Sequence, residues 1–129
     1  MGAILRAVGY DDAFPELAAV YLEDSWVLEV APSAEGVAIR LEAVLTPEHP
    51  LYRHPAPHEQ HCYRAGWLTV TGNAIDVQLS GRNPSLDPDG SADYGSIDTF
   101  RTVADGFWEM EGDWGSVKVN QPVVRLQLD

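Results

Sequence analysis

The stretch Val37-Ala38-Ile39-Arg40-Leu41-Glu42-Ala43-Val44-Leu45 decides the fold class of this chain. Its odd-numbered residues are aliphatic, whereas the residues between them include the charged Arg40 and Glu42. Side chains of a strand point alternately to opposite faces of a sheet, so this alternation predicts a strand with one buried face. Ser33-Ala34-Glu35-Gly36 precedes the stretch and predicts a hairpin loop that joins it to another alternating run, residues 26–30.

The rest of the chain continues in short β-type runs that turn residues separate. We expect the further strands at residues 62–71, 74–80, 97–103, 107–111, 117–120 and 123–128. Gly72-Asn73 predicts a turn between the first two of these, and Asp105-Gly106 is typical of a hairpin turn. Pro122 predicts a break or a sheet edge near the end of the chain.

Residues 11–23 form the segment that favours a helix, of three turns at most. An aspartate can cap its start, Pro15 suits a first turn, and aliphatic side chains follow. Seven or eight short strands with one short N-terminal helix predict a mainly β fold, either an antiparallel β-sandwich or a small barrel. We expect its core to bury Ile39, Leu41, Ile75, Val77 and Leu79.

The 129 residues predict a single domain, 1–129, that buries enough surface to fold around one core. Cys62 is the one cysteine, so no intramolecular disulfide can form, which favours a reducing compartment. Residues 1–9 are too short and interrupted for the apolar region of a signal peptide, and no apolar run approaches a membrane span. We therefore expect a cytoplasmic protein.

The formal net charge of −12 limits the classes of partner. Neutralising the phosphates of a nucleic acid needs clustered lysine and arginine, so the charge argues against nucleic-acid binding. It argues equally against an anionic membrane surface. A basic protein partner is compatible with it, because acidic surfaces attract such proteins over long distances.

The loop between residues 80 and 98 interrupts the strand-like sequence and carries Asp87, Asp89, Asp93 and Asp98. Converging carboxylates are the ligands that Ca²⁺ prefers. The window departs from an EF-hand, however, because Ala92 replaces the glycine, Asp98 replaces the final glutamate, and no helix flanks it. Turn formation by aspartate, glycine, serine and proline is the simpler interpretation.

All four histidines lie in one proline-rich segment that ends beside Cys62. They are His49, His54, His58 and His61. Imidazole and thiolate groups are good zinc ligands, but one cysteine without a paired motif does not match a known zinc site. A pH-sensing role for the histidines is an equally weak interpretation. We expect an exposed loop here, and the sequence predicts neither a metal nor a cofactor.

Two turns each place an aromatic side chain among small residues and acids. They are Asp93-Tyr94-Gly95-Ser96-Ile97-Asp98 and Gly112-Asp113-Trp114-Gly115. Together at one end of the fold they would form a recognition surface for a cationic or hydroxylated group. The candidate interaction surface consists of Asp93, Tyr94, Asp98, Asp113 and Trp114. In the alternative interpretation glycines permit the turns, aspartates cap them, and the two aromatic rings plug the core.

These two turns, together with Trp26-Val27-Leu28, resemble small uncharacterised bacterial all-β proteins. Some such proteins are similar to immunity factors that are encoded beside secreted toxins. The resemblance implies an acidic protein that plugs a basic toxin, and it carries over no catalytic residue. The chain also lacks the Gly-x-Ser-x-Gly motif and the phosphate-binding glycine loop, so no catalytic residue is predicted.

The sequence thus favours a non-catalytic binding protein whose acidic face binds a basic protein, in the manner of an immunity factor. The alternative from another class is a small-molecule or metal-binding β-barrel, including an enzyme, that uses the loop from Asp87 to Asp98. A binding pocket would distinguish the two, because a ligand site needs a concave apolar surface with a few converging polar groups.

Overall fold

The computed structural model of the chain describes residues 9–81, 85–86 and 92–129. The elements are α1 (Tyr10–Ala13), the 3₁₀ turn η1 (Pro15–Leu17), β1 (Val20–Pro32), β2 (Gly36–Leu45), β3 (Cys62–Leu79), β4 (Ser85–Leu86), β5 (Ala92–Asp93), β6 (Thr99–Ala104), β7 (Phe107–Gly112) and β8 (Gly115–Leu128). The mainly β fold with one short N-terminal α-helix is confirmed. Within the described residues, neither helical segment has the length and apolarity that crossing a bilayer requires.

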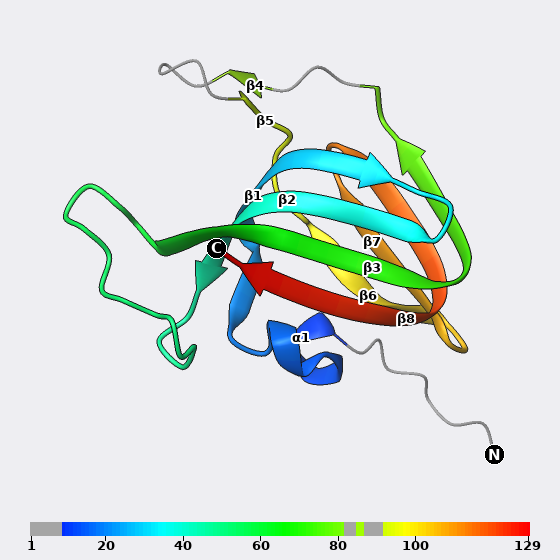
Figure 1. Cartoon of the computed structure of the whole chain (residues 1–129), viewed down its shortest axis with the longest axis horizontal. Helices are drawn as coiled ribbons and strands as arrows, with labels where there is room; N and C mark the ends of the chain where they lie inside the picture. The colour runs from blue at the N-terminus through cyan, green and yellow to red at the C-terminus, as the bar shows by residue number, and fades with distance from the viewer. Residues whose placement is uncertain (1–8, 82–84, 87–91) are drawn as a thin grey trace.

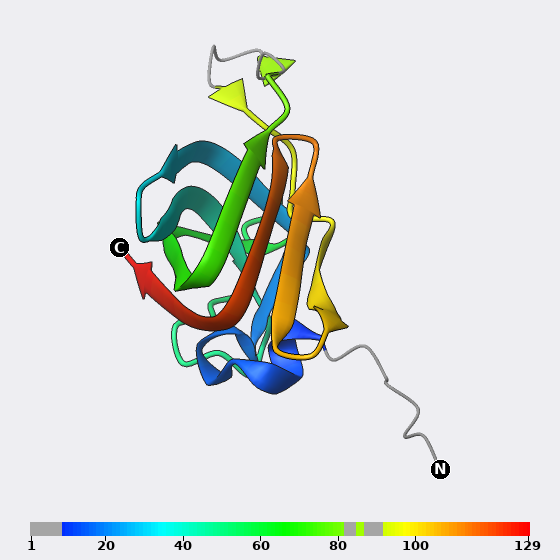
Figure 2. The same ribbon diagram turned by 90° about the vertical axis from the view of Figure 1, so that its right-hand side faces the viewer.

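Six strands form one antiparallel sheet in the order β1-β2-β3-β8-β7-β6, and β4 pairs separately with β5. The large sheet curves into a half-barrel around its concave face (Figures 1 and 2). The predicted sandwich and the predicted number of seven or eight strands are not confirmed. Long strands explain this arrangement, because a twisted sheet of long strands can coil around its own core.

The sequence stretch that predicts the fold class forms β2, inside the sheet. Its neighbours are β1 and β3, with Ile39 opposite Val30 on one side and Leu68 on the other. Ile39 and Leu41 are fully buried, as predicted, and Arg40 lies on the outer face. Outside the sheet, Arg40 donates two hydrogen bonds to the carboxylate of Asp129 and so ties down the last residue.

The predicted turn at Gly72-Asn73 is wrong, because β3 runs through it as one strand of 18 residues. The register with β8 shifts near Asn73, where Ala74 has a φ of 49° and Gln121 on β8 has a φ of 50°. Both strands therefore bend together at the place where a hairpin turn was expected. In the same way, β8 is one continuous strand where two strands were predicted at the end of the chain.

The bend changes which side chains of β3 reach the core. Ile75 and Val77 are partly buried and pack against it. Leu79 is 53% exposed, so its predicted burial is wrong. The bulged register disturbs the strict two-residue alternation on which that prediction relied.

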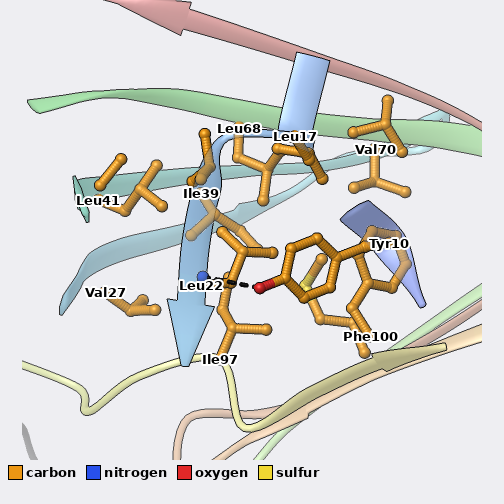
Figure 3. Close-up of a cluster of buried hydrophobic side chains, with 14 of the residues drawn as sticks. Tyr10, Leu17, Leu22, Val27, Ile39, Leu41, Leu68, Val70, Ile97 and Phe100 are labelled. Atoms are coloured by element: carbon orange, nitrogen blue, oxygen red, sulfur yellow. Dashed lines mark hydrogen bonds between the residues drawn. The ribbon is translucent and has the colours of Figure 1, made fainter. Parts of the chain in front are cut away.

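The core fills the concave side of the sheet, and Tyr10 and Leu17 of the N-terminal turns lie among its side chains (Figure 3). The Tyr10 hydroxyl accepts a hydrogen bond from the Leu22 backbone N–H at 3.0 Å. Phe14 stacks on Phe100 at 5.4 Å between ring centroids and also contacts Trp108 at 4.7 Å. The helical part ends earlier than predicted, because the chain already enters β1 at Val20.

A buried serine hydroxyl bridges β1 and β2 where their backbone pairing is interrupted. The register shifts between Tyr21 and Trp26, and Ser25 lies fully buried in this bulge. Its hydroxyl donates to the Tyr21 carbonyl at 2.8 Å and accepts the Val44 N–H at 2.9 Å. Without the hydroxyl, two backbone groups lose their partner.

We expect Ser25→Ala to lower the free energy of unfolding by about 1–3 kcal/mol, the cost of leaving a buried backbone group unpaired. Urea denaturation measures this change, and Ser33→Ala in the exposed β1–β2 turn is the control. An unchanged midpoint for Ser25→Ala would show that water replaces the hydroxyl.

Candidate functional site

The two turns that join aromatic side chains to acids meet in the structure. Residues 112–115 connect β7 to β8, with Gly112 opposite Gly115. The indole N–H of Trp114 donates to the Ser96 carbonyl at 3.2 Å, in the other turn. A Cβ added to Gly95 would lie 3.5 Å from a carboxylate oxygen of Asp113. Two segments separated in sequence thus form one end of the half-barrel.

Backbone hydrogen bonds hold residues 94–98 across this end. The Val27 N–H donates to the Gly95 carbonyl at 2.7 Å, and the Tyr94 N–H donates back to Val27 at 2.8 Å. At the other end of the segment, the Asp98 N–H donates to the Glu111 carbonyl at 2.8 Å. The segment therefore links β1 to β7, and one of its residues, Ile97, is fully buried.

The aromatic rings of the two turns pack into or against the core. Trp114 is only 3% exposed and belongs to the buried cluster. Tyr94 is half-buried and packs against the same cluster. The structure thus gives both rings the packing role of the alternative interpretation, and it leaves mainly carboxylates for contact with a partner.

Three exposed carboxylates surround this place, and we call Asp98, Glu111 and Asp113 the acidic end. Glu111 lies opposite Thr99 on β6 and Ser116 on β8, so neither cross-strand neighbour carries a positive charge. The carboxylate of Asp98 accepts a hydrogen bond from the Ser96 hydroxyl at 3.1 Å. The backbone of Asp93 belongs to β5, and its side chain lies outside what the structure describes.

A small cavity of about 180 Å³ adjoins the acidic end. It is lined by Glu29, Val30, Leu79, Ser80, Gly81, Tyr94 and Trp114. Cavities for drug-sized ligands usually hold about 300–1,000 Å³. This cavity is therefore better matched to one side chain of a partner protein than to a whole metabolite.

The calcium interpretation of the aspartate-rich loop involves Asp87 and Asp89, which lie outside the described residues. Of the other two aspartates, Asp98 is exposed at the acidic end. Across residues 9–81, 85–86 and 92–129, no three histidine, cysteine or acidic side chains are grouped as a metal would require.

Two of the four histidines, His49 and His61, make local contacts in the structure, and His54 and His58 are exposed. His49 accepts the Leu51 N–H through Nδ1 at 3.0 Å, and burial together with the nearby Arg64 lowers the pKa of its imidazole. His61 Nε2 lies 3.2 Å from a carboxylate oxygen of Asp24. The buried Cys62 thiol accepts the Arg53 N–H at 3.5 Å.

The proline-rich segment also shapes two larger cavities, which the sequence analysis did not predict. One, of about 540 Å³, lies between residues 48–51, the N-terminal turns and the end of β8. The other, of about 350 Å³, lies beside Tyr52, His61 and Cys62. Leu51 and Tyr52, two large apolar side chains among the prolines, are the signal in the sequence that could have indicated such walls.

We expect neither Ca²⁺ nor Zn²⁺ to raise the Tm of the protein. A metal at a hundred times its dissociation constant would add about 2.7 kcal/mol to the free energy of unfolding. For a chain of this size that corresponds to a shift of several degrees. A shift of that size with either ion, reversed by a chelator, would show that the aspartate-rich loop or the histidine segment binds metal.

No known protein family, characterised protein or solved structure matches this chain.

Proposed function

We propose that the protein is a non-catalytic binding domain that recognises a basic protein partner through the acidic end. The observation that carries the proposal is the meeting of the two turns that carry Asp98 and Asp113, which the hydrogen bond from the Trp114 indole to the Ser96 carbonyl joins. The ion pairs between side chains of the described residues, Arg40–Asp129 and Asp24–His61, involve none of these carboxylates. With a net charge of −12, such a surface attracts cations strongly.

The small cavity beside the acidic end supports the same proposal. Its apolar walls and the carboxylate of Glu29 suit a lysine or arginine side chain, whose stem is apolar and whose head is charged. Tyr94 offers an aromatic ring at the same place, and cations bind favourably over such rings. A side chain of the partner would anchor here while the exposed carboxylates orient the rest of its surface.

The resemblance to immunity factors makes a basic toxin one class of partner. The fold agrees with such a role, because a rigid curved sheet holds its turns in fixed positions. A toxin gene beside the gene for this protein would identify the partner to test first.

A capture experiment tests the proposal. The protein, the double variant Asp98→Lys/Asp113→Lys and the control Glu35→Lys/Asp105→Lys are immobilised at equal density. Each charge reversal adds two positive charges, so both variants change the net charge from −12 to −8. Glu35 and Asp105 are exposed in other turns of the molecule.

We expect the native protein and the control to retain the same basic protein, and the Asp98→Lys/Asp113→Lys variant to lose it. A protein retained equally by all three would contradict the proposed place of binding. Circular dichroism should show an unchanged fold in both variants, since exposed charges contribute little to stability.

The second candidate is the binding of a small molecule, and the two cavities beside the proline-rich segment favour it. Their volumes of about 540 and 350 Å³ fall within the usual range for ligand sites. In this proposal the ligand site is formed by residues 46–62 rather than by the loop from Asp87 to Asp98. Turnover or tight binding of a metabolite that survives Asp98→Lys/Asp113→Lys would favour this candidate over the first.

A further inference from the structure

The last part of β8 is a sheet edge. β3 pairs with β8 as far as Leu128, whereas β7 pairs only with residues 115–120. Gln121, with its φ of 50°, and Pro122 then bend β8 away from β7. Among the strands that the structure describes, residues 123–128 consequently pair with β3 alone.

The register shows which backbone groups of this edge point outward. The Asp129 N–H donates to the Ala65 carbonyl of β3 at 2.9 Å. Backbone groups alternate between the two sides of an antiparallel strand, so those of Leu126 and Leu128 point away from β3. The Leu126 N–H confirms this direction, because it donates to Glu16 Oε1 of η1 at 3.3 Å.

This side-chain carboxylate occupies the place where a neighbouring strand would present a carbonyl oxygen. The bond bridges an exposed edge, and covering an edge in this way is a known means of preventing unwanted strand pairing. A carboxylate on a flexible stem is nevertheless easily displaced by another acceptor. The edge is therefore protected in the isolated protein and still open to competition.

A groove lies along the same edge. It is the cavity of about 540 Å³, lined by Leu126 and Leu128 of β8, by residues of η1 and its neighbours, and by residues 48–51. The two leucine side chains are partly buried and pack against the core, so they form an apolar floor. The groove thus combines the outward-facing backbone groups of a sheet edge with an apolar surface, as sites that accept an added strand do.

The titratable groups in the wall of the groove are Glu16, Glu48 and His49. The hydroxyl of Thr46 donates to Glu48 at 2.7 Å and lowers the pKa of its carboxyl group, which favours the charged form. Burial and the nearby Arg64 lower the pKa of His49, which favours its neutral form. Nearby, Arg64 donates a hydrogen bond to the Asp129 carbonyl, but its side chain does not line the groove.

We propose that this groove binds an extended, basic segment of a partner protein, which pairs with residues 123–128 of β8 and replaces Glu16 at the Leu126 N–H. Two carboxylates on the walls provide the charge complementarity, and the alternating backbone groups provide the register. The groove lies at the far end of β8 from Asp113. Binding here goes beyond the role proposed for the acidic end and is tested separately from it.

The test measures the binding of one peptide, acetyl-(Lys-Val)₃-amide, to the whole protein and to two variants by isothermal titration calorimetry. Glu16→Ala and Glu16→Gln each remove one negative charge, but the glutamine carbonyl can still accept the Leu126 N–H. We expect Glu16→Ala to bind the peptide roughly twofold to tenfold more tightly than Glu16→Gln. This ratio is what one net hydrogen bond supplies.

Two N-methylated peptides complete the test, one methylated at the lysines and one at the valines. In an added strand, one of these two sets of N–H groups faces β8 and is needed for pairing, whereas the other set faces solvent. Only one of the two methylated peptides should therefore bind more weakly than the unmethylated peptide, by at least tenfold. Equal binding of both methylated peptides and of both Glu16 variants would show attraction by charge alone and overturn the proposal. The absence of binding at about 1 mM peptide would also overturn the proposal, and Glu16 would then serve only to prevent strand pairing at this edge.

Discussion

Replacing Ile39 by aspartate should lower the free energy of unfolding by roughly 3–5 kcal/mol. Ile39 is fully buried on an inner strand of the sheet, between Val30 of β1 and Leu68 of β3. A carboxylate there has no partner and must either lose its hydration or take up a proton, and both cost free energy. Urea denaturation followed by circular dichroism measures the loss.

The matched control for this change is Ala38→Asp, which places the same group one residue earlier on the opposite face of β2. We expect it to cost about 1 kcal/mol or less, because most surface substitutions have small effects. Equal losses for the two variants would contradict the assignment of the buried face.

Trp114→Ala should lower the free energy of unfolding by about 3–5 kcal/mol, the usual cost of removing a large buried aromatic side chain. The ring is 3% exposed and its indole N–H holds the Ser96 carbonyl, so its loss opens a cavity and releases residues 94–98. Because that segment carries Asp98, we also expect the acidic end to lose its fixed geometry.

Trp114→Phe separates the two effects of this side chain. It keeps most of the apolar volume but cannot donate to Ser96, so the expected loss is about 1–2 kcal/mol. Amide hydrogen exchange at Tyr94 and Asp98 then reports whether the segment opens locally. Unchanged exchange in both variants would show that the backbone bonds to Val27 and Glu111 suffice without the indole.

The fold class was predictable because hydrophobic alternation acts locally. Ile39 and Leu41 follow the two-residue period of a strand inside a sheet, and they are buried as that period predicts. Gly72-Asn73 shows where local reasoning fails, because the same dipeptide suits a hairpin and a bend. The choice depends on β8, which bends opposite at Gln121 and continues to pair with β3.

For the candidate site, turn chemistry correctly drew attention to residues 94–98 and 112–115, which lie together in the structure. The sequence did not determine whether Trp114 faces the core or a partner, because glycine-rich turns permit both. The grooves beside residues 46–61 were not foreseen, since a cavity arises from the packing of distant segments. Pro122 correctly indicated a break or an edge near the end of the chain, but the extent of the edge was not predictable, because it depends on where β7 ends.

The central claim is that the acidic end attracts a basic protein, and the association rate tests it most directly. With the captured partner in stopped-flow mixing, we expect the rate to fall steeply as salt rises, because charges are screened over about 8 Å at physiological ionic strength. At low salt Asp98→Lys/Asp113→Lys should associate at least tenfold more slowly than Glu35→Lys/Asp105→Lys, whose net charge is equal. Equal rates for these two variants, or a native rate that does not change with salt, would contradict the account.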